Sequence, residues 1–424
     1  MKRICVSAGF LFFNMAIYAA GPGPLSLDSC YSRARQFYPL IKQRGLIEKT
    51  RDYNISNAAK GYLPQFTING QATYQSAVTT IPFAIHLPGL DLTIPTLSKD
   101  QFNTHGEINQ TLYEGGVIKK QKELFKANAA IEEESNEVAL YALKDRINQL
   151  FFGTLLISEQ LKLDELVEKD IQNSIDLVQA SVNEGTALTS SLNQLQAKLL
   201  QQQQVRIDQS ASRKAYLDML SLFVNRTLDE STVLETPGSL TVSDSIRRPE
   251  LALYNFQKAT DVVQEQLLNN SNRPKITLFG QGGYALPGLN GFDVNPEWYY
   301  IGGIRLIWPL GGFYTQKNQK QILRLDQQTI DVQKEVFLFN THLTLRQQST
   351  DIVKLQQMIN KDTEIINKLT EVKNSARAQL ENGIVTTFEY IGDLDAEEQA
   401  RQNLLVHRVQ LLLDEYNYRN TSGD

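Results

Sequence analysis

The sequence contains little cysteine and has no marked excess of positive or negative charge. Each of these two features argues against certain classes of protein. Only two cysteines occur in 424 residues, and Cys5 lies in a segment that we expect to be removed. An internal disulfide and a cysteine-rich metal site are therefore excluded. Lys and Arg number 42 against 47 Asp and Glu, a formal charge of −5. Nucleic-acid binding calls for a clustered basic surface, so the charge balance gives no reason to expect that partner.

Motifs that carry catalytic chemistry are missing as well. The four histidines are scattered without metal-ligand spacing, and the sequence contains neither a Walker A loop nor a GxSxG elbow. Acidic pairs such as Glu397-Glu398 and Asp414-Glu415, and the glutamine run 201–204, are expected to be solvated helix faces. We therefore expect no enzyme, no bound metal and no cofactor.

Proline and glycine, 13 and 25 in number, are gathered in a few places. Residues 117–182 contain no proline and one glycine, and residues 314–380 contain neither. At 1.5 Å per residue, each segment would form a helix about 100 Å long, which is too long for one compact core. Apolar residues in the second segment alternate steps of three and four, which predicts a coiled-coil face. The first part of this face comprises Ile322, Leu325, Thr329, Val332, Val336, Phe339 and Leu343.

The one long apolar run lies at the N-terminus. Lys2 and Arg3 precede the run 4–18, and small residues follow it, which is typical of a secretory signal peptide over residues 1–20. An uncleaved membrane anchor is the alternative, but the run is short and interrupted by polar residues. Later in the chain no 18 consecutive apolar residues occur, so no transmembrane helix is predicted.

The remaining chain contains one pattern twice, in residues 21–246 and 247–424. Matching residues keep a constant separation: Pro39, Pro64, Gly70 and Tyr74 recur 210 residues later, Gly106, Gly115 and Gly116 recur after 196, and Gly185 recurs after 198. Each copy is predicted to run helix, two strands, very long helix, tip and helix. The predicted ranges are 27–60, 65–75, 102–112, 117–182 and 187–224 in the first copy, and 249–270, 275–285, 298–308, 314–380 and 386–418 in the second.

The predicted strands have the length and the aromatic content of membrane strands. Each spans about 9–11 residues, the length that a tilted transmembrane strand needs. Trp298 and Trp308 stand ten residues apart in one predicted strand, about 25 Å along the membrane normal, which is the spacing of two aromatic girdles. We expect Tyr299 and Phe313 at the same interfaces. Four strands cannot close a barrel, so several chains must contribute to one pore.

Several of these motifs also occur together in one family. They are the helix starts at Pro39 and Pro249, Leu63-Pro64, the strand end Leu306-Ile307-Trp308-Pro309-Leu310-Gly311-Gly312-Phe313, and the tips Asn183-Glu184-Gly185-Thr186 and Glu381-Asn382-Gly383-Ile384. In this respect the mature chain resembles TolC-type outer-membrane efflux proteins over essentially its whole length. The resemblance implies a membrane α+β fold: a homotrimer with four strands per chain in a shared twelve-stranded barrel in outer-membrane lipid, a periplasmic helical barrel, and a belt near residues 225–248.

The resemblance also implies partners. Such channels of Gram-negative bacteria dock through their periplasmic tips onto a membrane-fusion (adaptor) protein, which links them to an inner-membrane RND, MFS or ABC transporter. They act as passive exit ducts in efflux or type I secretion. Two other classes stay open on the residues alone: an outer-membrane-anchored coiled-coil structural protein or adhesin without a pore, and a soluble extracytoplasmic binding module.

The tips are the expected docking sites. Gly185 and Gly383 each follow an apolar helical run and precede a threonine that can cap the next helix, so at the least they are good turns. The small apolar residues beside them suit burial against an adaptor hairpin. The expected docking residues are Gly185, Thr186, Ala187, Leu188, Gly383, Ile384, Val385 and Thr386.

A periplasmic gate is expected from the resemblance. In relatives, acidic side chains six and nine residues past the second tip glycine face the lumen; here those positions are Glu389 and Gly392, with Asp393 one further along. The equivalent positions of the first copy are Ser191 and Gln194, which are neutral. Three symmetry-related Glu389 carboxylates at a constriction would favour cations over anions. The Arg–Asp latch of some relatives has no counterpart, because Val385 and Ser191 occupy its positions.

Overall fold

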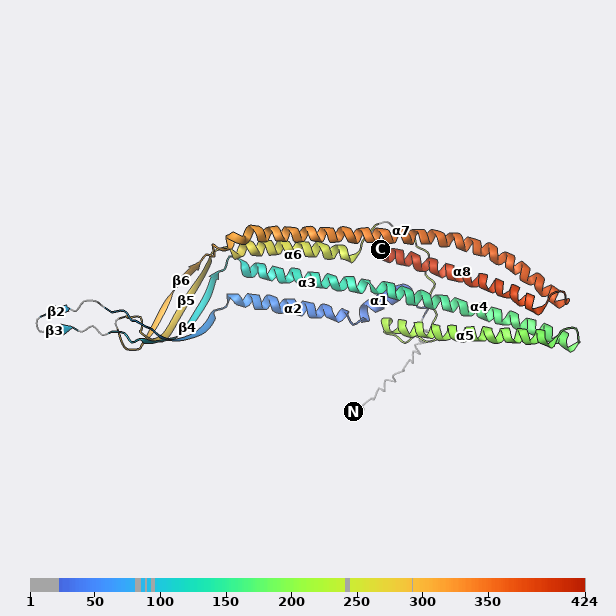
Figure 1. The fold of residues 1–424 in the computed structure, drawn as a ribbon, viewed down its shortest axis with the longest axis horizontal. Coiled ribbons are helices and arrows are strands. Elements are labelled where there is room, and N and C mark those ends of the chain that lie inside the picture. Colours follow the sequence, from blue (N-terminus) through green and yellow to red (C-terminus); the bar gives the residue numbers. More distant parts are fainter. Residues whose placement is uncertain are drawn as a thin grey trace, which may run out of the picture. The chain divides into compact units, whose positions relative to one another are not determined.

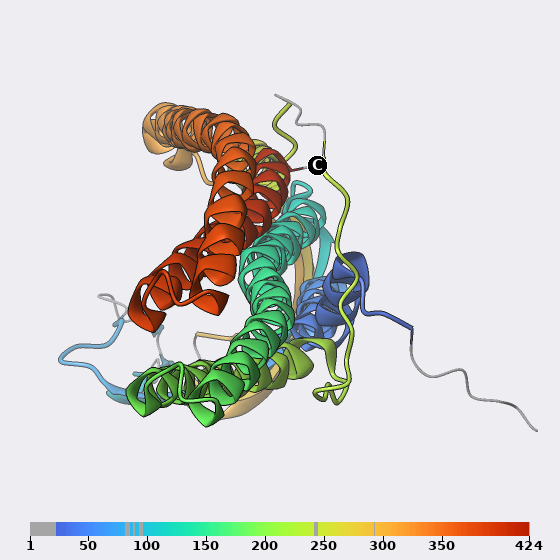
Figure 2. The same ribbon diagram turned by 90° about the vertical axis from the view of Figure 1, so that its right-hand side faces the viewer.

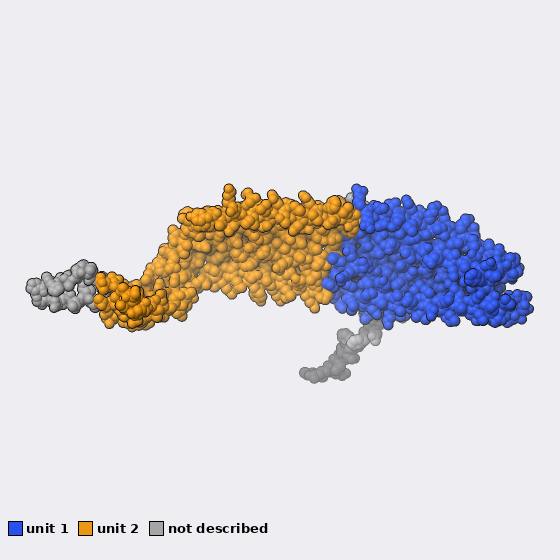
Figure 3. All heavy atoms as spheres, viewed as in Figure 1, with its two compact units in different colours: residues 1–38, 142–244, 345–420 blue, residues 39–141, 245–344, 421–424 orange. Residues whose placement is uncertain are grey.

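The computed structural model describes residues 23–80, 85–87, 90–92, 96–240, 245–291 and 293–423. The predicted signal peptide lies outside them. The chain divides into two compact units (Figure 3): unit 1 comprises residues 1–38, 142–244 and 345–420, and unit 2 comprises residues 39–141, 245–344 and 421–424. Each unit draws on both halves of the sequence, so the units cut across the predicted repeats 21–246 and 247–424.

Unit 1 is built from helices (Figure 1). They are α1 (Leu27–Phe37), α4 (Leu143–Asn183), α5 (Thr189–Val224), α8 (Thr387–Ser422) and the second part of α7 (Gly312–Glu381). Helices α4 and α5 form one hairpin, and α7 and α8 form another. One apolar cluster joins the two hairpins; its buried members are Val167, Ile171, Ile175, Val178, Leu192, Leu195, Ala376, Tyr390 and Leu394. Each large side chain buried there contributes about 1.5–3 kcal/mol of hydrophobic free energy.

Unit 2 combines helices with a sheet. Its helices are α2 (Ile41–Ala59), η1 (Lys60–Tyr62), α3 (Val117–Tyr141), α6 (Pro249–Ser271) and the first part of α7. Strands β1 (Gln65–Tyr74), β4 (Asp100–Tyr113), β5 (Lys275–Leu286) and β6 (Glu297–Ile307) form an antiparallel sheet in the order β1-β4-β5-β6. Strands β2 (Ile85–Leu87) and β3 (Leu90–Leu92) form a separate antiparallel pair.

The sheet has two chemically different faces. Its register pairs even-numbered residues with even-numbered ones, as in Phe66 with Ile108 and Tyr284 with Trp298. Alternate residues of a strand point to opposite faces, so the even-numbered residues share one face. The large apolar residues exposed on that face are Phe66, Ile68, Tyr74, Ile108, Leu278, Trp298, Tyr300, Ile304 and Leu306, and Tyr300 is 87% exposed.

The odd-numbered face carries a set of hydrogen-bonded polar side chains. Tyr299 donates its hydroxyl proton to Asn103 (2.9 Å) and accepts a hydrogen bond from Gln281 (3.0 Å). Arg305 lies 3.3 Å from the Glu107 carboxylate and belongs to the same face. Strand β1 pairs only with β4, and β6 only with β5, among the described residues. Both outer strands therefore present unpaired edges in a single chain.

The change from sheet to helix is held by close contacts between glycines and the end of α6. Gly115 and Gly116, between β4 and α3, have φ of 78° and 83°, which favours glycine. The side chain of Asn270 donates a hydrogen bond to the carbonyl of Gly116 (3.1 Å), and a Cβ on Gly115 would lie 2.7 Å from the carbonyl oxygen of Asn270. At the start of α7, a Cβ on Gly312 would collide with Oδ1 of Asn272. Residues at the end of α6 thus contact both connections between strand and helix, the one from β4 to α3 and the one from β6 to α7.

Several predicted elements differ in their bounds. The helix expected over 27–60 is two helices, because Pro39 cannot continue the first one and Tyr38 is extended (ψ 134°). The helix expected over 117–182 is interrupted at Ala142, where no proline or glycine marks the break. Strand β6 ends at Ile307. Trp308 therefore stands just outside the strand in which it was expected, since Pro309 follows it.

The predicted coiled-coil face of α7 is uncovered in its first part. Ile322, Leu325, Val332, Val336, Phe339 and Leu343 are each 50–64% exposed. Further along the helix, Leu355 and Ile366 are buried. No helix among the described residues combines the length and the apolar character that crossing a membrane requires.

Candidate functional site

Both hairpins of unit 1 end in the same kind of turn (Figure 2). Gly185 and Gly383 have φ of 75° and 66°, in the left-handed region that glycine adopts without strain. In each turn the glycine N–H donates to the carbonyl three residues back, and the next N–H donates to the carbonyl five residues back, at 2.9–3.1 Å. This pair of hydrogen bonds defines a Schellman motif, so the two tip glycines end their helices in the same way.

The two tips differ in how the next helix begins. At the start of α8, the Glu389 carboxylate accepts hydrogen bonds from the backbone N–H (2.8 Å) and the hydroxyl (3.0 Å) of Thr386, whose hydroxyl oxygen in turn accepts the N–H of Glu389 (3.2 Å). This is a capping box. The N–H of Thr386 lowers the pKa of Glu389. At the start of α5, Leu188 caps the helix without any side-chain hydrogen bond.

The four expected gate residues lie near these helix starts. Glu389 is exposed and Asp393 half-buried on α8, while Ser191 is half-buried and Gln194 exposed on α5. Among the described residues, no hydrogen bond or ion pair joins any two of the four. Their side chains are therefore brought to one end of unit 1 without forming a cluster in a single chain.

Exposed apolar side chains accompany the tip turns. Leu188 and Ile384, two of the expected docking residues, are each 72% exposed. Phe388, which the sequence analysis did not single out, is 74% exposed. Ala187 packs against the apolar cluster instead, which leaves less of it available to a partner. Phe388 could have been identified from the sequence, because it lies between Thr386 and Glu389, in the first turn of the helix that follows the tip.

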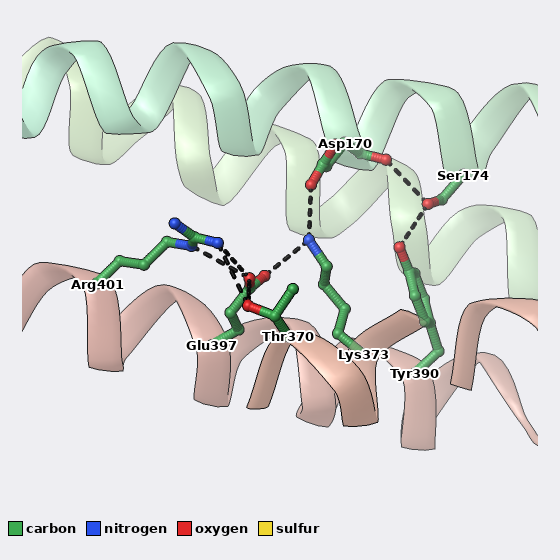
Figure 4. A network of polar contacts seen from close by, with 7 residues as sticks. All are labelled: Asp170, Ser174, Thr370, Lys373, Tyr390, Glu397 and Arg401. Atoms are coloured by element: carbon green, nitrogen blue, oxygen red, sulfur yellow. Dashed lines mark hydrogen bonds and ion pairs between the residues drawn. The ribbon is translucent and has the colours of Figure 1, made fainter. Parts of the chain in front are cut away.

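Further from the tips, a buried ionic network joins the two hairpins (Figure 4). Lys373 of α7 lies 3.0 Å from the Asp170 carboxylate of α4 and 2.7 Å from the Glu397 carboxylate of α8, and its side chain is only 13% exposed. Glu397 also accepts hydrogen bonds from Thr370 (2.6 Å) and from Arg401 (2.7 Å). A single lysine therefore holds three helices together.

The contacts of Glu397 determine its protonation. Burial by itself would raise the pKa of this carboxyl, but the hydrogen bonds from Lys373, Thr370 and Arg401 outweigh it and lower the pKa to about 2. Glu397 is therefore ionised across the neutral range. Next to this network, Ser174 donates to the carbonyl of Asp170 (2.9 Å). Because a serine hydroxyl has one proton, the Tyr390 hydroxyl must donate to Ser174 (2.9 Å).

The expectation that the paired acids are solvated is wrong for two of them. Glu397 and Glu415 are 3% and 2% exposed. Glu415 accepts hydrogen bonds from the hydroxyl of Ser239 (2.9 Å) and the N–H of Leu240 (3.1 Å). Gln202, within the run 201–204, is 2% exposed. The spacing along α8 could have predicted this burial. Leu394 follows Tyr390 by four residues and Glu397 follows Leu394 by three, which is the spacing of a buried helix face.

Of the four expected membrane-interface aromatics, Trp298 and Tyr299 lie on opposite faces of the sheet, and Trp308 and Phe313 follow it. Trp298 is 82% exposed on the apolar face, together with Tyr300. Tyr299 needs correction, because alternation places it on the polar face, where its hydroxyl bonds to Asn103. The indole N–H of Trp308 donates to the carbonyl of Asn272 (3.1 Å). Phe313, on the first turn of α7, is 47% exposed.

The described residues offer neither a metal site nor a reactive thiol. No group of three or more His, Cys, Asp or Glu side chains with the placement of a metal site occurs in the described part of the chain. Cys30 is fully buried, and burial raises the pKa of its thiol to about 12, so the thiolate is not formed near neutrality.

Similarity to known proteins comes from structure alone. No protein-family model matches the sequence, and no curated protein matches it. Among solved structures, CusC matches with a TM-score of 0.67 at 16% identity, over 93% of this chain and 91% of that one. The outer-membrane protein VceC of Vibrio cholerae has a TM-score of 0.65 at 14% identity, over 93% and 96%. The open MtrE outer-membrane channel of Neisseria gonorrhoeae has a TM-score of 0.61 at 14% identity, over 94% and 88%.

Proposed function

Because the chain has the fold of TolC-type outer-membrane channels, we propose that it is a passive exit duct in the outer membrane of a Gram-negative bacterium. Three copies form the duct, which serves a tripartite efflux or type I secretion system. One observation carries the proposal: a sheet with an apolar aromatic face, a polar face and two open edges. In lipid, such edges must be paired, and the apolar face must point to the hydrocarbon.

Copies of the same chain supply the missing pairing. Four strands from each of three copies make a twelve-stranded barrel, with β6 of one copy beside β1 of the next. The polar face, with Arg305 and Glu107, then lines the lumen. The uncovered apolar face of α7 likewise packs against a neighbouring copy and completes a helical wall. Duplicated tips fit a chain descended from two repeats, each contributing one hairpin to that wall.

A conductance measurement tests the duct. Purified mature protein in a planar lipid bilayer should give discrete channels, and its mass in detergent should be that of three chains. A cysteine pair placed at facing positions of β1 and β6 should cross-link different copies and no single chain. An oligomer without conductance would instead support an outer-membrane-anchored coiled-coil structural protein or adhesin. A monomer that stays soluble without detergent would support an extracytoplasmic binding module.

The tips are proposed to dock onto a periplasmic adaptor, through the exposed Leu188 and Ile384. The adaptor in turn binds the inner-membrane transporter, which selects the cargo and supplies the energy. Gly185→Asp and Gly383→Asp should abolish export with the trimer intact, since they place charge on the docking surface. Gly185→Ala is the matched control, because it has the same left-handed backbone cost without the charge. Normal export by both aspartate variants contradicts docking at these turns.

Glu389 is proposed to form the lumenal ring of the closed entrance. Glu389→Gln should lower cation selectivity, and the variant is well matched because glutamine preserves the capping box while removing the charge. The measurement is the reversal potential of single channels in a salt gradient, with Glu371→Gln on α7 as a control. An unchanged reversal potential would leave Glu389 with its capping role only.

A further inference from the structure

The polar face of the sheet carries few charges. It is formed by the odd-numbered residues of β1, β4, β5 and β6, all of which the structure describes. Lys275 and Glu297 are the first residues of β5 and β6, and antiparallel pairing places them at opposite ends of the sheet. Between the strand ends, the only Asp, Glu, Lys or Arg residues on this face are Glu107 of β4 and Arg305 of β6. These two side chains therefore supply the fixed charge of its middle part.

Glu107 and Arg305 form an ion pair across the intervening strand β5. Nη1 of Arg305 lies 3.3 Å from Oε1 of Glu107, and the side chain of Asn109 donates a hydrogen bond to the same oxygen (3.0 Å). The guanidinium of Arg305 lies over the ring of Phe279 on β5, with Cζ 4.5 Å from the ring centroid. A cation held over an aromatic ring is attracted by the quadrupole of that ring. Three strands thus fix the two charges next to one another.

The other polar side chains of this face form an uncharged hydrogen-bonded belt. Nδ1 of His105 donates to Oδ1 of Asn103 (2.9 Å), so Nε2 of the neutral ring accepts a hydrogen bond from Asn69 (3.4 Å). The same oxygen of Asn103 accepts the hydroxyl proton of Tyr299, which in turn accepts a hydrogen bond from Gln281. All four strands contribute to this belt, and in this arrangement it adds no charge to the pair.

We infer that Arg305 and Glu107 determine the ion selectivity of the part of the duct that is built from strands. The inference rests on the proposed function, because only a closed barrel of three copies turns the polar faces into a lumen. Both side chains reach the surface of that face, with 43% and 17% of their area exposed. Three such pairs line the lumen, and in each pair the opposite charges cancel at close range. The barrel therefore passes cations, anions and uncharged polar solutes alike, and it does not sort cargo by charge.

Removing one charge of the pair tests this balance. Arg305→Gln leaves three uncompensated carboxylates in a lumen with low-dielectric walls, which concentrates cations. The permeability ratio of cations to anions should then rise on the order of tenfold, and Glu107→Gln should lower it by a similar factor. The double variant should return to the wild-type ratio. Reversal potentials in a salt gradient measure the ratio, with every protein in the Glu389→Gln background so that the proposed entrance ring adds no charge.

Salt concentration and a conservative variant serve as controls. The Debye length is about 30 Å at about 10 mM salt and about 3 Å at about 1 M, so both shifts should be large in dilute salt and should disappear in concentrated salt. Arg305→Lys, which restores the charge without the planar contact to Phe279, should return the ratio to the wild-type value. An unchanged ratio in Arg305→Gln overturns the inference, as does a double variant that stays shifted.

Labelling of introduced cysteines gives the same readout should a single variant fail to assemble. Thr277 stands opposite Arg305 in the register, whereas Ile304 belongs to the apolar face. The native Cys30 of the mature chain is buried, and burial raises the pKa of its thiol to about 12, so it does not react. A negatively charged thiosulfonate reagent on Thr277→Cys should shift the ratio toward cations, and a positively charged one toward anions. Ile304→Cys should give no shift, and equal shifts from both positions contradict a lumen lined by the polar face.

The possible outcomes separate the role of the pair from the duct itself. Absence of conductance in the wild type refutes the proposed duct. Trimeric channels whose selectivity ignores both Arg305→Gln and Glu107→Gln leave the duct standing and refute the role of the pair. The result at Glu389 does not affect this comparison, because all the barrel variants share one background.

Discussion

Two buried carboxylates of unit 1, Glu397 of α8 and Asp164 of α4, have opposite electrostatic environments. Glu397 receives a lysine, an arginine and a threonine, and its pKa falls to about 2. Asp164 receives only amides on one oxygen, and its pKa rises to about 6. Burial opposes ionisation in both cases, so the difference lies in the partners that each helix supplies. The same bundle therefore contains one fixed charge and one group that titrates near neutrality.

Removing the lysine of the fixed-charge site should have the largest effect. Lys373→Met leaves Asp170 and Glu397 without their shared cation, and we expect a loss of about 3 kcal/mol in the free energy of unfolding. Glu397 keeps Arg401, which holds the loss at the lower end of the range for broken buried pairs. The measurement is denaturant unfolding in detergent, and Lys361→Met, an exposed lysine on the same helix, is the control. Equal losses in both variants would mean that the network contributes nothing specific.

Neutralising the acid should have a smaller effect that depends on pH. Glu397→Gln should cost about 2 kcal/mol at neutral pH, since charged hydrogen bonds are lost while the amide keeps part of the contacts. The folded pKa of Glu397 lies below its unfolded value, so the wild-type contribution is present above about pH 4.3 and is lost as the pH falls toward 2. The difference in free energy of unfolding between the wild type and Glu397→Gln should therefore be smaller at pH 3 than at pH 7. If this difference is the same at both pH values, the loss comes from packing and not from the charge of Glu397.

Near neutral pH, only one of the two acids should change how stability depends on pH. The folded pKa of Asp164 lies above its unfolded value near 3.9, so protonation of Asp164 adds stability as the pH falls through about 6. Between pH 8 and pH 5, Asp164→Asn should flatten the rise that protonation gives the wild type, whereas Glu397→Gln should leave that rise intact. Thermal unfolding at closely spaced pH values separates the two variants. Identical slopes in both would remove the distinction drawn between the sites.

The smallest effect is expected at the hydroxyl pair next to the network. Tyr390→Phe removes the proton that Tyr390 donates to Ser174, but Ser174 keeps its bond to the Asp170 carbonyl. We expect a loss of about 1 kcal/mol and an unchanged pH dependence. Ser174→Ala should cost a similar amount, and the double variant should cost less than the sum, because the two residues share one bond.

The architecture could be predicted from the sequence to a large extent. The absence of proline over 314–380 predicted one long helix, and α7 is continuous from Gly312 to Glu381. The strands were placed within about two residues, and both tip glycines were identified from their position after apolar runs. These features depend on local chemistry, which a single sequence displays directly.

The polar interior could not be predicted in the same way. Glu397 was expected to be solvated, because its partners Lys373 and Asp170 lie on other helices, far away in the sequence. Tyr299 was grouped with Trp298 because both are aromatic, although strand alternation separates them. The break at Ala142 has no local signal at all. In each case the deciding contact is tertiary, and residue type alone does not reveal it.

The crossing from strands to helices offers a route to engineering. Its geometry depends on Gly115, Gly116 and Gly312, which lie against Asn270, Asn272 and Arg273 at and just after the end of α6. None of these three contact residues belongs to a strand. Side chains on either face of the sheet can therefore be exchanged as a block, and a library that varies only those faces should keep its helices in register. In the proposed duct, such a library would alter the lumen lining and the lipid-facing surface, while the joint between strands and helices stays constant.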